Sequence, residues 1–393
     1  MKKCCVSISD LNDEQLRIIK FPLEKNILVI GPASSGKTQL LFQRAVFLAK
    51  QHNISSECYR IFVSNEIQKD FLKSEVLRFA LPDEVFTTLN DWCRLLYESY
   101  ISKDLPRVYI NLKIDYLRVR QSVLNLLQRR KELRNLLKIA LVDDGQDLSP
   151  EAFEILSHSA SHVTVFADFE QKVIASETSP EIILQKLKPE CVKINISRSY
   201  RESPLIANLA SYFISEEDAS LESFPQSFFR TKGIECPVCY IAPSFEEEMN
   251  QLAETVSLRM LKGERVGIIV PSLSLVHEVS LQLKKRGVEV EKAIEREAQN
   301  VAHGGYNFTN SYPKITTYSI SKGLKFQSVL LPQLTENSFS WAQNEMRKRA
   351  LFIGLSRASS WVYLSTVKGL EFREIEILKR AKEKGFILLI DFF

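Results

Sequence analysis

The sequence has 393 residues, of which 45% are hydrophobic and 25% charged, and its net charge is +4. This composition can bury a core large enough for two domains, and it excludes collagen-like, disulfide-framework and wholly disordered proteins. No apolar run approaches the ~18 residues that a membrane helix needs, and the run after Lys2 and Lys3 is too short for a secretory signal. We therefore expect a cytoplasmic protein that makes no membrane contact.

Short apolar runs alternate with amphipathic stretches along the whole chain. Runs of strand length occur at 26–30, 60–64, 139–143, 162–168, 237–242, 265–271, 314–319, 328–332 and 361–365. Helical patterns between them include TQLLFQRAVFLAKQH and EEEMNQLAETVSLRMLKG. This alternation predicts an α/β fold with parallel sheets covered by helices. Because it runs through both halves, we expect two α/β domains, roughly 1–193 and 194–393.

Residues 94–138 interrupt the alternation. They predict a helix, a turn around Pro106 and a long basic helix over 118–138, which together form a helical insertion in the first domain. The segment holds eleven Lys or Arg against four Asp or Glu, a local charge of +7. It is either a surface for an anionic partner or a solvated helical hairpin.

The strongest motif is GPASSGKT, which follows the predicted strand NILVI and opens the next helix. It fits the phosphate-binding pattern GxxxxGK[ST] in the context that this pattern requires. The loop and the helix N-terminus turn backbone N–H groups toward phosphate oxygens, while the lysine reaches the β- and γ-phosphates and the threonine reaches Mg²⁺. The predicted nucleotide-binding residues are Gly31, Pro32, Ala33, Ser34, Ser35, Gly36, Lys37 and Thr38.

A second motif, LVDDGQD, ends a predicted strand in two acids. Asp143 is placed to hold Mg²⁺, and Asp144 to orient a water molecule for attack on the γ-phosphate. Alone, the two acids could be a solvated turn. Downstream of a phosphate-binding loop, they predict the second half of an ATP hydrolase.

Two arginines far along the chain, Arg201 in SRSYRES and Arg357 in GLSRASS, could supply positive charge to a γ-phosphate in the transition state. The alternative for either arginine, taken alone, is an ordinary surface residue. Among the seven cysteines, an odd number typical of reduced thiols, Cys236 and Cys239 form a CxxC pair. The pair would need two more ligands to bind zinc, and the alternative is a buried strand with two incidental thiols.

The order of motifs resembles that of the UvrD/Rep/PcrA branch of superfamily 1 DNA helicases over nearly the whole length. The matching segments are LNDEQ (11–15), GPASSGKT (31–38), FVSNEIQKDF (62–71), TLNDWC (88–93), VDDGQD (142–147), FADFEQ (166–171), ISRSYRES (196–203), TYSISKGLKF (317–326) and LFIGLSRA (351–358). The resemblance implies two RecA-like lobes with ATP and Mg²⁺ in the cleft between them. Segments 62–71 and 88–93 resemble motifs that contact single-stranded DNA.

The resemblance also assigns roles to single residues. It implies that Gln15 and Tyr200 hold the adenine base and that Gly323 belongs to the nucleotide-contacting set. Lys37, Thr38 and Asp143 hold phosphates and Mg²⁺, and Asp144 is the catalytic carboxylate. The residues implied to sense the γ-phosphate are Gln171, Arg201 and Arg357.

Several positions depart from the family pattern. Asp144 stands where the family has glutamate, Ile174 where a DNA-stacking tyrosine is usual, and Lys325 and Ser319 replace a glutamate and a histidine. The spacing leaves no room for either domain-sized insertion of long family members. The ATP-facing residues are kept better than the DNA-facing ones, which weakens the expectation of strand separation more than that of ATP hydrolysis.

Two functions follow. The first is an ATP-driven single-strand DNA translocase or helicase, with 3′→5′ polarity by resemblance. The second is a nucleotide-dependent regulatory subunit that switches a protein partner, such as a nuclease in phage defence or DNA repair. The lost aromatic residue and the trimmed insertions favour the second function, and the basic insertion favours the first.

The chain ends in an apolar run, FILLIDFF (386–393), after an amphipathic segment at 371–385. Because a large exposed apolar patch is rare, the run is expected to add a strand to the second domain or to pack against it. The alternative is a docking peptide for a partner subunit.

Overall fold

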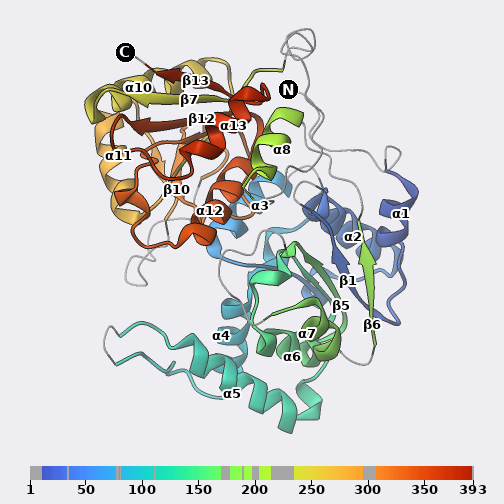
Figure 1. The fold of residues 1–393 in the computed structure, drawn as a ribbon. Helices are drawn as coiled ribbons and strands as arrows, with labels where there is room; N and C mark the ends of the chain where they lie inside the picture. Colours follow the sequence, from blue (N-terminus) through green and yellow to red (C-terminus); the bar gives the residue numbers. More distant parts are fainter. Residues whose placement is uncertain are drawn as a thin grey trace. The chain divides into compact units, whose positions relative to one another are not determined.

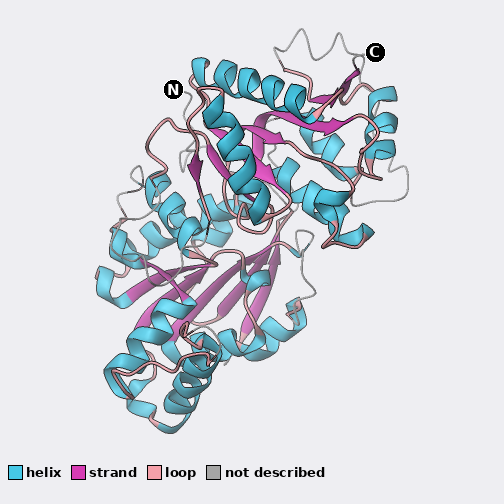
Figure 2. Ribbon diagram, turned by 90° about the vertical axis from the view of Figure 1, so that its left-hand side faces the viewer, coloured by secondary structure: helices cyan, strands magenta, loops and turns pink. Residues whose placement is uncertain are grey.

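The computed structural model describes residues 11–32, 35–76, 79, 81–109, 112–169, 178–187, 190–196, 203–213, 234–294 and 307–391. The chain divides into two compact units, formed by Met1–Tyr200 with Glu297–Gly305 and by Arg201–Arg296 with Tyr306–Phe393. Each unit is built on one parallel sheet, of six and seven strands (Figures 1 and 2). The predicted α/β class is confirmed, and the two sheets are consistent with two RecA-like lobes. In the described part of the chain, no helix is long and apolar enough to cross a membrane.

The first sheet has the strand order β3-β2-β4-β5-β1-β6, and all its pairs are parallel. Its strands are β1 (Asn26–Ile30), β2 (Tyr59–Val63), β3 (Phe86–Thr88), β4 (Leu137–Val142), β5 (Ala160–Ala167) and β6 (Cys191–Asn195). The four predicted apolar runs correspond to β1, β2, β4 and β5. Two strands have no counterpart among the predicted runs. They are β3, which is three residues long, and β6, whose side chains are all half-buried or exposed. Both lie at the edges of the sheet, where an apolar run is not required.

Helices cover both faces of this sheet. They are α1 (Asp13–Ile19), α2 (Lys37–Gln51), α3 (Glu66–Val76), α4 (Leu89–Tyr100), α5 (Tyr116–Arg129), α6 (Pro150–Ser159) and α7 (Pro180–Lys186). Val163 and Val165 of β5 point into a core shared with α4, α5, α6 and α7. Thr164 between them points to the opposite face, where it contacts α2.

The basic helix is shorter than predicted. It begins at Tyr116 and ends at Arg129, and a 3₁₀ turn over Lys131–Leu133 leads into β4. The prediction of one helix over 118–138 was therefore wrong at its C-terminal end. Leu137 and Lys138 form the start of a buried strand, because the sheet requires an extended chain there. Two of the basic side chains are also used in structural contacts. Arg120 pairs with Glu151, and Arg134 donates to backbone carbonyls at the end of α5.

The second sheet has the order β13-β7-β12-β11-β8-β10-β9. Its strands are β7 (Val238–Ala242), β8 (Val266–Val270), β9 (Glu291–Lys292), β10 (Lys314–Thr317), β11 (Phe326–Leu331), β12 (Ala358–Val367) and β13 (Leu388–Asp391). Its helices are α8 (Pro204–Ser211), α10 (Phe245–Leu261), α11 (Leu273–Lys285), α12 (Asn344–Ser356) and α13 (Ile375–Glu383). Apolar residues of α10 and α11 form the core on one face.

The C-terminal run completes this sheet. Leu388–Asp391 forms edge strand β13, in which Leu388 lies opposite Val238 of β7. The two preceding residues, Phe386 and Ile387, are fully buried. This confirms the expectation that the run adds a strand to the second half of the chain.

A buried arginine fastens α1 to α2 in the first unit. Arg44 of α2 is fully buried and donates to three carbonyls at and just beyond the end of α1, those of Ile18, Ile19 and Phe21. Its Nη2 lies 2.9 Å from His162 Nε2, and its Nε donates to Thr164. Burial lowers the pKa of Arg44 to about 9, while burial and the neighbouring Arg44 charge lower the pKa of His162 to about 3. At neutral pH, His162 is therefore uncharged and can accept from the guanidinium.

We predict that Arg44→Met lowers the free energy of unfolding by about 3–5 kcal/mol, because it leaves three buried carbonyls and a buried imidazole without their donor. Denaturant unfolding at pH 7 measures this. The control is Arg17→Met, since Arg17 lies exposed on α1 and its loss should change stability by no more than about 0.5 kcal/mol. Equal stability of the two variants would contradict the role given to Arg44.

Candidate active site

At two positions of the loop between β1 and α2, glycine is the residue that fits best. Gly36 takes a left-handed conformation with φ of 85° at the N-cap of α2, where a side chain would be strained. A Cβ on Gly31 would lie 2.7 Å from Ser35 Oγ. The Ser35 hydroxyl is itself buried and has no hydrogen-bond partner. This buried polar group can bind a ligand that enters the loop.

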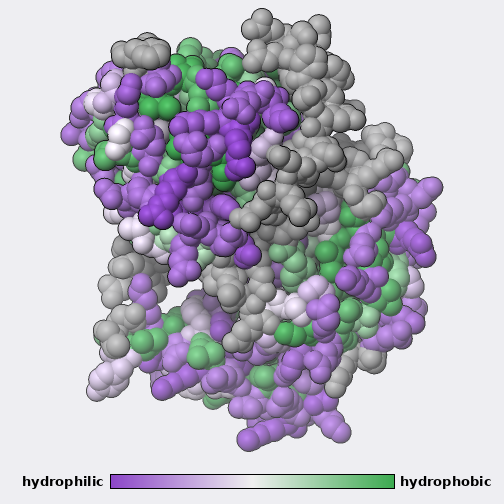
Figure 3. All heavy atoms as spheres, in the orientation of Figure 1, coloured by the Kyte–Doolittle hydropathy of each residue, from purple (hydrophilic) through white to green (hydrophobic). Residues whose placement is uncertain are grey.

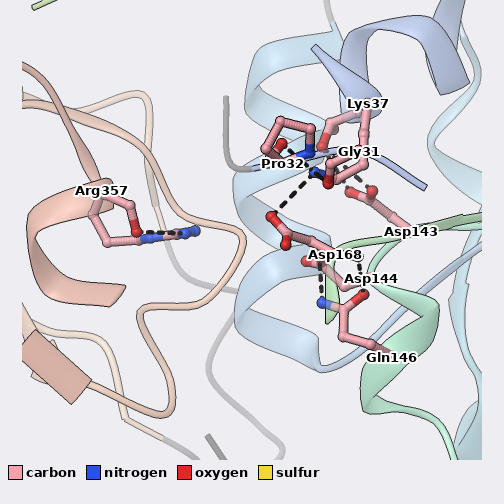
Figure 4. A network of polar contacts seen from close by, with 10 residues as sticks. Gly31, Pro32, Lys37, Asp143, Asp144, Gln146, Asp168 and Arg357 are labelled. Atoms are coloured by element: carbon pink, nitrogen blue, oxygen red, sulfur yellow. Dashed lines mark hydrogen bonds and ion pairs between the residues drawn. The ribbon is translucent and has the colours of Figure 1, made fainter. Parts of the chain in front are cut away.

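Lys37 turns back over the loop from the first position of α2 (Figure 4). Its Nζ donates to the carbonyls of Gly31 and Pro32, both at 2.8 Å, and lies 3.3 Å from Asp168 Oδ2. The Lys37 and Asp168 side chains are 9% and 1% exposed, so the pair is shielded from water. A charged donor is thus held at the loop by groups that an anion could replace.

Thr38 joins α2 to the end of β4. Its hydroxyl donates to the Asp143 carboxylate, with Oγ1 3.0 Å from Oδ2 and 3.3 Å from Oδ1. Asp143 is buried, and its backbone N–H donates to the Phe62 carbonyl of β2. A hydroxyl and a carboxylate in contact are oxygen ligands of the kind that Mg²⁺ prefers.

Asp144 is held on both sides by amide groups. It takes a left-handed conformation with φ of 53°. Its Oδ2 accepts from Gln68 Nε2 at 3.0 Å, and its Oδ1 accepts from Gln146 Nε2 at 3.2 Å. Gln146 Oε1 in turn accepts from the backbone N–H of Asp168 at 2.9 Å. These contacts connect α3, the turn after β4 and the end of β5 to Lys37.

Gln15 lies close to the loop but has a structural role of its own. Its backbone N–H donates to Asn12 Oδ1, and its Oε1 accepts from the Asn12 N–H, which together form a capping box at the start of α1. A Cβ on Gly36 would lie 3.9 Å from Gln15 Nε2. The amide nitrogen therefore faces the loop while the amide oxygen is used by the cap.

The structure brings together Gln15, Gly31, Pro32, Ser35, Gly36, Lys37, Thr38, Asp143 and Asp144 of the predicted set. Two of the others lie in the second unit. Gly323 sits in the turn between β10 and β11 with φ of 75°, and Arg357 caps the C-terminus of α12, where its Nε donates to the Ile353 carbonyl. Ala33, Ser34, Gln171, Tyr200 and Arg201 lie outside the described residues.

The sequence analysis assigned no role to three residues of this network, Gln68, Gln146 and Asp168. All three stand inside segments that it had singled out. Asp168 directly follows a buried strand, which is the signal that had identified Asp143 and Asp144. Gln68 gave no such signal, because its contact with Asp144 joins residues 76 positions apart.

One cysteine of the CxxC pair lies in strand β7, and the other lies two residues before that strand. Cys239 is fully buried in β7, and burial raises the pKa of its thiol to about 12; burial likewise raises the pKa of Cys236 to about 11. Over the described ranges, no three His, Cys, Asp or Glu side chains form a group that could hold a metal ion.

Comparison with known proteins returns little. No protein family matches the sequence, and no curated protein matches it. Among solved structures, the chain is similar to the C-terminal domain of a possible DNA helicase from Lactobacillus plantarum WCFS1, with 20% identity and a TM-score of 0.35. The match covers 49% of this chain and 99% of that one.

We predict that Gly145→Ala perturbs the turn that carries Asp144, because a Cβ there would lie 2.3 Å from Val165 Cγ1. Overpacking of this kind costs about 1–3 kcal/mol of unfolding free energy. Denaturant unfolding should show this loss. Val165→Ala removes the obstructing methyl groups, so the double variant should be more stable than the sum of the two single losses by about 1 kcal/mol. Additive losses would contradict the proposed clash.

Proposed function

We propose that the chain hydrolyses ATP in the presence of Mg²⁺ and uses this turnover to move along single-stranded DNA, as a superfamily 1 translocase or helicase. The observation that carries the proposal is the meeting of Lys37, Thr38, Asp143 and Asp144 at one edge of the first sheet. These are a cation for phosphates, two oxygen ligands for a metal ion and a second carboxylate, and ATP hydrolysis uses each of them.

In this proposal the loop residues bind the phosphates. Backbone N–H groups at the start of α2 and the Ser35 hydroxyl would donate to phosphate oxygens, and Lys37 would exchange the carbonyls of Gly31 and Pro32 for them. Thr38 and Asp143 would hold Mg²⁺, which neutralises phosphate charge. Asp144 would accept a proton from the attacking water and fix its direction.

The remaining assignments rest on the resemblance. The same hypothesis proposes that the nucleotide is contacted by Gln15, Tyr200 and Gly323. It also proposes that the γ-phosphate is contacted by Gln171, Arg201 and Arg357. For Gln15, the capping box supports a narrower version, in which only the amide nitrogen is available to the base.

Lys37→Ala should reduce ATP turnover by at least ~10²-fold, equivalent to about 2.7 kcal/mol of barrier, because it removes the charge facing the phosphates. Phosphate release measured with and without Mg²⁺ tests this. Lys50→Ala is the matched control, since Lys50 is an exposed lysine of the same helix. Near wild-type turnover in the Lys37 variant would refute the site assignment.

The DNA component of the proposal rests on charge. Arg118 is exposed on α5, and the last residue of this helix and the two residues after it are three consecutive exposed cations. They are Arg129, Arg130 and Lys131. Phosphate contacts by such side chains bind nucleic acid without sequence preference and release counterions.

We predict that changing these three cations to glutamate weakens binding of single-stranded DNA. Each lost phosphate contact lowers the salt slope of the binding constant by about 0.7, so three contacts lower it by about 2. Fluorescence anisotropy with a labelled oligonucleotide over a salt series measures this. The control reverses Lys379, Arg380 and Lys382, exposed cations of α13, with the same change in net charge.

One surface favours the second candidate, a regulatory ATPase subunit that switches a protein partner. The hairpin between α4 and α5, closed by the bridge between Arg107 and Ile114, presents Tyr109 at 99% exposure and Leu112 at 64%. Further large apolar side chains exposed nearby are Leu95, Tyr100, Ile101 and Leu117. In Figure 3, apolar spheres lie among hydrophilic ones over this part of the first unit. The leucines and the isoleucine among these side chains suit a protein partner better than a phosphate backbone.

The glutamate triple variant separates the two functions. If the protein is a translocase, the triple variant should bind single-stranded DNA more weakly than the wild type and should lose any stimulation of ATP turnover by that DNA. If DNA neither binds nor stimulates the wild-type protein while ATP turnover persists, the partner-switching function stands in its place.

A further inference from the structure

We infer that Gln68 is a positioning residue that sets the direction of the Asp144 carboxylate and thereby makes ATP hydrolysis depend on the turn between β2 and α3. The inference rests on the proposed function. It concerns a side chain that the sequence motifs assign to no role, in a segment expected to contact nucleic acid rather than ATP.

The amide of Gln68 has only one orientation that satisfies its surroundings. The side chain is fully buried in the first turn of α3. Its Oε1 accepts from the backbone N–H of Ser64 at 3.0 Å and from the Ser64 hydroxyl at 2.6 Å. Because the oxygen is used twice by Ser64, the NH₂ group must point the other way, and there it donates to Asp144 Oδ2. The backbone at this point is fixed as well, since the Gln68 N–H donates to Asn65 Oδ1 at 2.8 Å.

The amides of Gln68 and Gln146 orient the Asp144 carboxylate without using all of its acceptor sites. Gln68 uses one lone pair of Oδ2, and Gln146 uses one of Oδ1. A carboxylate has about four lone-pair sites, so each oxygen can still accept from a water molecule. Asp144 is half-buried, whereas Gln68 and Gln146 are buried. The arrangement fixes the side chain while the residue stays partly accessible to solvent.

The same helical turn is tied to the insertion. Lys69, the next residue, lies 2.5 Å from Glu66 and 3.1 Å from Asp91 in the first turn of α4. Helix α4 leads directly into the hairpin that carries Tyr109 and into basic α5. Contacts therefore run from α4 through the start of α3 to Asp144, and from Asp144 through Gln146 to Asp168 and Lys37. A shift of α3 when a ligand binds the insertion would move the group that holds the carboxylate.

Two variants test this in the full chain. Gln68→Met keeps the length of the side chain and removes both sets of hydrogen bonds. Gln68→Glu keeps an acceptor for Ser64, replaces the donor to Asp144 with an oxygen and so places a second carboxyl beside Asp144. Each should lower kcat for ATP by ~10- to 10²-fold and leave KM within about threefold, because the hydrogen bonds of Gln68 among the described residues go to Ser64, Asn65 and Asp144 rather than to the loop after β1. The Gln68→Glu variant also keeps the test valid if Gln68→Met does not fold.

A double variant decides whether Gln68 acts through Asp144. With Asp144→Asn in place, adding Gln68→Met should lower the residual kcat by less than twofold, because the carboxylate that it positions is gone. Ser159→Ala is the structural control. It removes a buried hydrogen bond from Trp92 Nε1, 3.1 Å long, so it should lower Tm and leave kcat unchanged.

The outcomes separate this inference from the function on which it rests. Three results would each overturn it while the wild-type turnover and the reduced turnover of Asp144→Asn persist. They are wild-type kcat in folded Gln68 variants, a rise in KM that equals the fall in kcat, and additive losses in the double variant. A wild-type protein that neither binds nor hydrolyses ATP would refute the proposed function, and the inference would fall with it.

Discussion

Three parallel strands of the first unit end side by side, and the polar residues that follow them must satisfy one another away from water. Strand β5 lies between β1 and β4, so the groups after these strands face each other at one edge. An unpaired charge buried there would cost several kcal/mol. The Lys37 ammonium therefore pairs with Asp168, and the Thr38 hydroxyl with Asp143. The same edge supplies a cation, carboxylates and a buried hydroxyl to any phosphate that enters the loop.

Helix α2 connects this edge to the rest of the unit. Its first residues contact the loop after β1, and Arg44, two turns later, donates to backbone carbonyls at the end of α1. The start of α1 in turn places Gln15 beside Gly36. Arg44 is fully buried and charged. If α1 separated from α2, the Arg44 guanidinium would lose its acceptors while it remained in an apolar core, which is unfavourable. Helix α2 thus positions both the loop after β1 and helix α1.

In the second unit, a single buried acid accepts hydrogen bonds from groups on two other segments of the chain. Glu248 of α10 is fully buried, and burial raises the pKa of its carboxyl. Its Oε1 accepts from the backbone N–H of Gln333, after β11, and from the hydroxyl of Ser365 in β12. Gln333 takes a left-handed backbone conformation with φ of 57° that the carboxylate holds in place. At the edge of this sheet, β13 pairs with β7, so the described part of the apolar C-terminal run is used within the chain.

Local pattern determined the α/β class, nine of the strands and the composition of the loop around Gly36 and Lys37, because periodicity and glycine spacing are local properties of a sequence. It failed where tertiary contacts decide. The basic helix ends at Arg129 because the next residues are drawn into β4, and helix propensity carries no information about a sheet register. Gln68 reaches Asp144 only because β2 and β4 are neighbours, a pairing between segments 76 positions apart that no local signal records. Which polar groups pair at the edge of the sheet is settled by strand order, and strand order exists only in the folded chain.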